Sequence, residues 1–188
     1  MITSKKQLNE YIRIERDLYL PKSCCVERIL EGENQYKIYL FLKLLRKTEY
    51  HYNKKGNVHK FLYAIYKRRK NILGRKLGLE MWENCFDIGL RIEHCGNIVV
   101  NGHSRIGKNC ILHGSNCIGN NGITSAAPRL GDNVRLGVGA KVIGDVDIAS
   151  NVVIAAGAVV VKSCYEEGAV LAGVPARVVK VNDKSQGH

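Results

Sequence analysis

Aliphatic side chains recur at every sixth position along the second half of the chain. Of the thirteen positions spaced by six residues between 88 and 160, eleven are aliphatic, and the exceptions are His94 and Thr124. Helices repeat every ~3.6 residues and strands every second residue, so neither element alone explains this period. A period of six is typical of a parallel β-helix, in which three hexapeptides form one three-sided coil. The aliphatic positions, which we expect to point inward, are Ile88, Val100, Ile106, Leu112, Ile118, Leu130, Leu136, Val142, Ile148, Ile154 and Val160.

A second inward position follows four residues after each aliphatic one, and it is mostly small or β-branched. Cys110 and Cys164 fall in this series, so we expect both to fill the core. Cys95 follows His94 directly. Neighbouring side chains on an extended strand point to opposite faces, so a reactive Cys–His pair is not expected there.

The first half of the chain has a helical pattern instead. Segments 33–50 and 58–79 carry apolar residues near i, i+3 and i+4 spacing, with lysines and arginines on their other faces. The chain therefore divides into a basic α-helical region, residues 1–84, and a β-helix domain, residues 85–188.

Positive charge is concentrated in the helical region. The chain carries 29 Lys and Arg against 17 Asp and Glu, a net charge of +12. A basic amphipathic helix can lie on an anionic membrane surface, although a solvated helix face explains the same pattern. No nucleic-acid motif accompanies the basic run at 67–70, so no nucleic-acid partner is expected.

Several features indicate a cytoplasmic protein without a metal centre. There is no apolar run near the ~20 residues of a membrane span, and the N-terminal segment is charged throughout. The seven cysteines are most simply reduced thiols, and none forms a C-x-x-C pair of the common zinc spacing. Contact with a membrane would then be peripheral, at the inner face.

The two interruptions of the six-residue series indicate a site. His94 stands where an aliphatic residue is expected, and Glu93 precedes it. An imidazole in an apolar column costs free energy unless it is paired, so the histidine has a task or lies in a frayed first coil. If one coil has eighteen residues, position 112 stacks on 94 and brings His113 close. The polar stretch 120–129, which begins with Asn120 and Asn121, predicts a loop that walls the same cleft.

Two segments carry a family resemblance, E-H-C-G-N-I-V-V at 93–100 and A-G-V-P-A-R at 172–177. With the hexapeptide period, they resemble serine acetyltransferases over roughly residues 86–181. They resemble still more closely the serine-acetyltransferase-like O-acetyltransferases of capsular polysaccharide biosynthesis. The resemblance implies a homotrimer of left-handed β-helices, acetyl-CoA as cosubstrate, and active sites between neighbouring subunits. It further implies that His94 is the general base and that Glu93 orients it, with direct transfer and no acyl-enzyme.

The resemblance also implies where the cofactor lies. In this family CoA lies along the main chain of the helix, and small residues let it approach. Charged side chains could meet its phosphates. The matching positions here are Gly137, Val138, Gly139, Ala155, Ala156, Gly157, Lys162, Pro175 and Arg177.

Two departures from serine acetyltransferases bear on the acceptor. The family's second histidine, in R-H-P-K-I, matches Ala127 of A-A-P-R-L, and the helical region is shorter and more basic. Both departures favour a sugar hydroxyl of a polysaccharide or its precursor, bound near His113, Asn120 and Asn121. Serine is the alternative acceptor. N-acetylation of an amino sugar and a non-catalytic, membrane-recruited β-helix are further alternatives.

Overall fold

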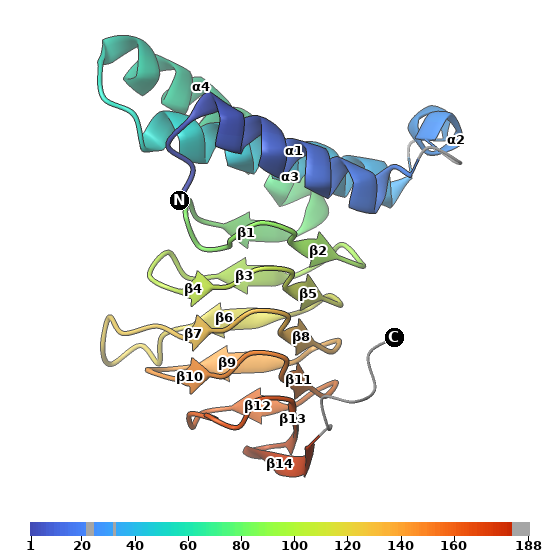
Figure 1. Cartoon of the computed structure of the whole chain (residues 1–188), viewed down its shortest axis with the longest axis vertical. Helices are drawn as coiled ribbons and strands as arrows, with labels where there is room; N and C mark the ends of the chain where they lie inside the picture. The colour runs from blue at the N-terminus through green and yellow to red at the C-terminus, as the bar shows by residue number, and fades with distance from the viewer. Residues whose placement is uncertain (22–24, 32, 182–188) are drawn as a thin grey trace.

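Four helices lie across one end of a stack of short strands (Figure 1). The computed structural model describes residues 1–21, 25–31 and 33–181. The helices are α1 (Lys5–Tyr19), α2 (Cys25–Leu30), α3 (Asn34–Tyr52) and α4 (Asn57–Leu77). A capping box between Ser4 and Gln7 begins α1, and Gly78 in the left-handed conformation ends α4. The two helices predicted at 33–50 and 58–79 are therefore present as α3 and α4.

The strands that follow form a three-sided parallel β-helix. They make a five-stranded, a three-stranded and a six-stranded sheet, parallel except for the last pair, β13 and β14. The strands are β1 (Leu79–Met81), β2 (Arg91–Ile92), β3 (Ile98–Val100), β4 (Arg105–Ile106), β5 (Ile111–Leu112), β6 (Cys117–Gly119), β7 (Arg129–Leu130), β8 (Arg135–Leu136), β9 (Lys141–Ile143), β10 (Asp147–Ile148), β11 (Val153–Ile154), β12 (Val159–Val160), β13 (Ala169–Gly173) and β14 (Ala176–Val181).

The predicted aliphatic series forms the core from the second coil onward. Leu112, Leu136 and Ile154 stack in register on β5, β8 and β11. Every aliphatic member of the series from Val100 to Val160 is buried, and Cys110 and Cys164 are buried with them. The prediction of a β-helix with a small helical region is confirmed.

The register of the first coil differs from the prediction. Ile92 pairs with Leu112, whereas six-residue counting placed position 94 there. The turn at 93–97 is two residues longer than strict counting allows, so His94 lies in the turn and is exposed. Ile88 is only half-buried. The prediction that Ile88 points inward is wrong, and at His94 the coil is irregular, one of the two alternatives left open by the sequence.

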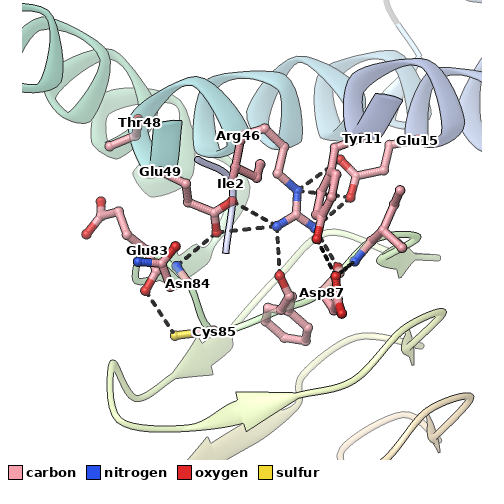
Figure 2. A network of polar contacts seen from close by, with 12 residues as sticks. Ile2, Tyr11, Glu15, Arg46, Thr48, Glu49, Glu83, Asn84, Cys85 and Asp87 are labelled. Atoms are coloured by element: carbon pink, nitrogen blue, oxygen red, sulfur yellow. Dashed lines mark hydrogen bonds and ion pairs between the residues drawn. The ribbon is translucent and has the colours of Figure 1, made fainter. Parts of the chain in front are cut away.

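A buried arginine joins the helical region to the first coil (Figure 2). Arg46 of α3 is fully buried, with Nη2 2.6 Å from Glu15 Oε1 and Nη1 3.0 Å from Glu49 Oε2. It also donates to the carbonyl oxygens of Phe86 and Asp87, each at 2.9 Å. A buried guanidinium is tolerated only when its donors are satisfied, so this network fixes how the helices sit on the β-helix.

A second buried pair ties α4 to the first coil. Lys70 Nζ lies 2.9 Å from Glu83 Oε1 and donates to the Met81 carbonyl at 2.7 Å. Because β1 already pairs with β3, the first β-helix strand follows directly on α4. The division of the chain at residues 84 and 85 stays a prediction.

Candidate active site

The turns between the three sheets form three edges of the prism, which we name by their contents. The His94 edge is the set of turns 93–97, 113–116, 137–140 and 155–158, between the six-stranded and five-stranded sheets. The loop edge is the set 101–104, 120–128, 144–146 and 161–163, between the five-stranded and three-stranded sheets. The asparagine edge is the set 107–110, 131–134 and 149–152.

The asparagine edge is a structural ladder. The Asn109 side chain donates to Asn133 at 3.1 Å, and the Asn133 side chain donates to Asn151 at 2.9 Å. All three residues have φ near +60°, a conformation that asparagine tolerates better than other non-glycine residues. The other two edges carry the residues of chemical interest.

Backbone hydrogen bonds hold the turns of the His94 edge in one column. Ser115 N donates to Gly96 O at 3.0 Å, Gly139 N to Gly114 O at 2.9 Å, and Gly157 N to Val138 O at 2.8 Å. A Cβ added at Gly114 would lie 3.4 Å from His94 Cβ, so the histidine sits directly beside bare main chain. His94 is therefore an exposed imidazole at one end of a column of small residues.

The N-terminal helices hold the turn that carries His94. Gln35 of α3 donates from Nε2 to the Glu93 carbonyl at 2.8 Å. The Tyr19 hydroxyl of α1 accepts a short hydrogen bond from Ile92 N. The Glu93 carboxylate lies 2.8 Å from the Arg91 guanidinium, an ion pair along the strand. The helices thus position the imidazole, and the orienting role of Glu93 toward His94 stays a prediction.

His113 lies on the same edge, one coil further along. It is half-buried, and its amide donates to Leu136 O at 3.0 Å. The next residue, Gly114, is the one that approaches His94. The turns that carry His113 and His94 are therefore adjacent, as expected.

Most of the predicted cofactor positions also fall on the His94 edge. Gly137-Val138-Gly139 and Ala155-Ala156-Gly157 form its last two turns. A Cβ at Gly137 would lie 2.6 Å from Ala156 N, so these turns stack without room for a side chain between them. The edge continues into the β13–β14 hairpin, where Ala155 N donates to Leu171 O. Exposed Pro175 and Arg177 lie at and just after the tip of that hairpin.

Lys162, Asn120 and Asn121 lie elsewhere, on the loop edge. The Asn120 side chain donates to Thr124 O, and Asn121 Oδ1 accepts from the amides of Ile123 and Thr124. In Figure 1 this loop, between β6 and β7, projects on the side of the prism away from the turn after β2. The expected cleft of His94, Glu93, His113 and the loop therefore does not form within one chain. The loop follows a strand of a different sheet.

Sequence reasoning missed one histidine. His103 is exposed on the loop edge, and its Nδ1 lies 3.1 Å from the carbonyl oxygen of Ser125 in the loop. Counting one coil of eighteen residues from position 103 leads to 121, within the loop, so the period itself could have indicated this neighbourhood.

The cysteines near the site are protonated thiols. Burial raises the pKa of Cys95 and of Cys117, and it raises the pKa of Cys110 to about 12. A thiol is a poor nucleophile, so the chemistry falls to the imidazoles. Among residues 1–21, 25–31 and 33–181, no three His, Cys, Asp or Glu side chains gather as a metal site would need.

Comparisons with known proteins place this geometry in context. Residues 127–162 match the bacterial transferase hexapeptide family (six repeats). The serine acetyltransferase of Staphylococcus xylosus is 31% identical over 141 residues, which span 69% of this chain and 64% of that protein. That of Synechococcus elongatus is 30% identical over 132 residues, 64% of this chain and 54% of that protein. The chain thus spans less than two thirds of the length of these relatives.

Solved structures share the fold. A serine acetyltransferase of Neisseria gonorrhoeae superposes with a TM-score of 0.75 at 23% identity, over 97% of this chain and 70% of that chain. One from Brucella abortus in complex with coenzyme A gives 0.73 at 21%, over 95% and 70%. The soybean apoenzyme gives 0.73 at 19%, over 93% and 70%. The left-handed parallel β-helix is confirmed by these likenesses, and the sequence matches confirm the resemblance to serine acetyltransferases.

The relatives overturn the acceptor favoured by the sequence. A sugar hydroxyl of a polysaccharide was expected because Ala127 replaces a family histidine and the helical region is short and basic. The matching proteins are serine acetyltransferases, so the polysaccharide prediction is wrong, and the alternative acceptor has the better support.

Proposed function

We propose that this hexapeptide-repeat chain, similar in sequence to serine acetyltransferases, transfers the acetyl group of acetyl-CoA to the hydroxyl of L-serine. The single observation that carries the proposal is the His94 edge. It aligns an exposed imidazole with a column of small residues along which a thioester can lie. The name of the sequence relatives suggests serine as the acceptor, and a solved structural neighbour in complex with coenzyme A suggests acetyl-CoA as the cosubstrate.

His94 acts as the general base in this proposal. The serine hydroxyl is a weak nucleophile because its pKa is far above neutrality, so its proton must leave as attack proceeds. The imidazole takes that proton while the hydroxyl oxygen bonds to the thioester carbonyl carbon. The tetrahedral oxyanion then collapses, the C–S bond breaks, and the CoA sulfur receives the proton. Main-chain N–H groups of the edge are suitable donors to the oxyanion.

Acetyl-CoA would lie along the His94 edge. The turns at Gly137 and Ala156 are too close for intervening side chains, so the pantetheine arm meets main chain there. The exposed Arg177 guanidinium, after the hairpin tip, is suited to a phosphate. Lys162 reaches this region only from another subunit, because it lies on the loop edge.

A homotrimer supplies that second subunit. In a closed ring each subunit presents one surface to the next and receives a different one. The His94 edge and the loop edge are such a pair, and both expose apolar side chains. Val138 is 52% exposed on the first, and Ile123 is 87% exposed on the second. Packing one on the other would bring Asn120 and Asn121 near the neighbouring subunit's His94, and it would bring Lys162 to the far end of that edge, toward Arg177.

The test is an acetyl-transfer assay on the purified chain. Release of CoA thiol in the presence of L-serine is expected, with NMR showing the acetyl group on oxygen. His94→Ala should lower kcat by about 100-fold or more, the range of general-base catalysis. His59→Gln, a histidine on α4, is the matched control and should leave kcat unchanged. A wild type that releases no CoA with serine would reject the proposal.

Peripheral membrane contact is a separate proposal and rests on α4. Its exposed apolar side chains Val58, Phe61, Ile65 and Ile72 share one helical face. Exposed Lys and Arg residues flank that face, which suits an anionic bilayer surface. No helix among the described residues is long and apolar enough to cross a bilayer. The cytoplasmic location stays a prediction.

Co-sedimentation with vesicles tests the membrane proposal. Binding is expected to vesicles that contain phosphatidylserine and not to pure phosphatidylcholine. The double variant Phe61→Ser, Ile65→Ser should weaken it, whereas Tyr165→Ser, at a side chain 77% exposed in the turn after β12, should not. Equal recovery of the wild type with and without anionic vesicles at low salt would count against it.

A further inference from the structure

We infer that His103 completes the acceptor site of the neighbouring subunit, where its imidazole holds the amino group of serine. The inference rests on the proposed serine acetylation by a homotrimer. His103 is exposed on the loop edge, and none of the roles assigned above uses it.

The height of His103 along the coil is the first argument. The turn 93–97 leads into β3, and the turn 101–104 leaves the same strand. The two turns therefore lie at one level of the stack, on different edges. A threefold axis parallel to the coil axis changes no heights. When the His94 edge of one subunit meets the loop edge of the next, His94 therefore faces the turn that carries His103.

The turn that carries His103 is held from both sides. The His103 amide donates to Asn101 Oδ1 at 2.9 Å. The Arg105 guanidinium donates to the carbonyl oxygens of Gly102, at 2.9 Å, and Ser104, at 2.7 Å. A side chain on a fixed turn loses less conformational freedom when a substrate binds.

The contact with Ser125 sets the tautomer of the neutral His103 ring. A carbonyl oxygen only accepts hydrogen bonds, so Nδ1 of His103 must carry the proton it donates to Ser125 O at 3.1 Å. In the neutral imidazole the other nitrogen, Nε2, is then an acceptor. An acceptor on the far side of the cleft from His94 suits the ammonium group of serine, which would leave the hydroxyl to face the base.

Steady-state kinetics test this assignment. Loss of a hydrogen bond to a charged group should raise KM for serine about 10- to 100-fold in His103→Ala, with KM for acetyl-CoA unchanged. His103→Gln, which can offer an amide oxygen, should recover part of the loss. 3-Hydroxypropionate, which lacks the amino group, should be used equally by wild type and His103→Ala.

Mixed trimers test whether the histidine comes from the neighbour. His94→Ala and His103→Ala chains are co-expressed in equal amounts and assayed at serine concentrations below KM. Every mixed ring then holds one site with both imidazoles intact. About three quarters of random trimers are mixed, so about one quarter of wild-type activity should return. The His59→Ala chain mixed with His94→Ala is the matched control for assembly.

The outcomes separate this inference from the function on which it rests. A wild type inert toward serine rejects the function and the inference together. An active wild type with an unchanged serine KM in His103→Ala rejects the inference alone. A raised KM without recovery in mixed trimers rejects the contribution from a neighbouring subunit. Circular dichroism and gel filtration of each variant exclude loss of fold as the cause.

Discussion

Replacing the buried arginine that joins helices to β-helix should destabilise the whole chain. Arg46→Met keeps an unbranched apolar stem but removes the guanidinium group that satisfies Glu15 and Glu49, each only 1% exposed. It also leaves the Phe86 and Asp87 carbonyls without this donor. Breaking a buried ion pair on one side costs about 3–5 kcal/mol, because the remaining charge stays buried.

The assay is urea unfolding followed by circular dichroism at fixed protein concentration, since stability of an oligomer depends on concentration. Arg28→Met is the matched control. Its partner Glu33 lies 3.3 Å away, and the two side chains are 28% and 39% exposed. A pair at the surface contributes about 0–1 kcal/mol. If Arg46→Met cost no more than Arg28→Met, the argument that this network fixes the helices on the β-helix would be refuted.

Three further changes have defined outcomes. Gly137→Ala should destabilise the fold and raise KM for acetyl-CoA, because its Cβ would lie 2.6 Å from Ala156 N; Gly119→Ala, whose nearest atom is 3.8 Å away, should do neither. Asn133→Ala should lower the free energy of unfolding in urea by about 1–3 kcal/mol, because two hydrogen bonds of the ladder are lost. A smaller loss than that caused by the control Asn57→Ala, at an exposed asparagine, would contradict the role of the ladder. Burial, His59 and Lys47 lower the pKa of His51. Its contribution to stability should therefore fall as pH drops from about 7 to 5, and His51→Phe should flatten that dependence in urea midpoints.

The period of six predicted most of the core because each coil repeats the same steric demand. From Val100 onward an inward position can hold only a side chain that stacks on its neighbours. The core of the first coil was predicted wrongly because its turn at 93–97 is longer and shifts the six-residue series by two positions. Phe86, Ile92 and Ile98 are also spaced by six, and all three are buried. A sequence read in one phase misses such a shift.

The site was predicted only in part for a related reason. Counting one coil from His94 brought His113 close, and a backbone hydrogen bond from Ser115 N to Gly96 O joins their two turns. The positions of Gly139 and Gly157 on the same edge came from the family resemblance and not from counting. Which edge a loop leaves from depends on which sheet precedes it, and a hexapeptide count does not distinguish the three sheets. The identity of the acceptor could not be predicted in this way. Ala127 indicates only that a family histidine is absent, and its absence does not identify the molecule that binds there.

The antiparallel strand β14 at the far end of the stack protects that end from association with other molecules. Parallel coils offer the next coil a row of unpaired N–H and C=O groups, so an uncovered end is a template for another molecule. The helices cover one end, and β14 folds back on β13 at the other, with an exposed and partly basic outer row. Chains that lack residues 174–181 would present a bare parallel strand at this end alone, so two such molecules would join end to end and the helices at the outer ends would stop further growth.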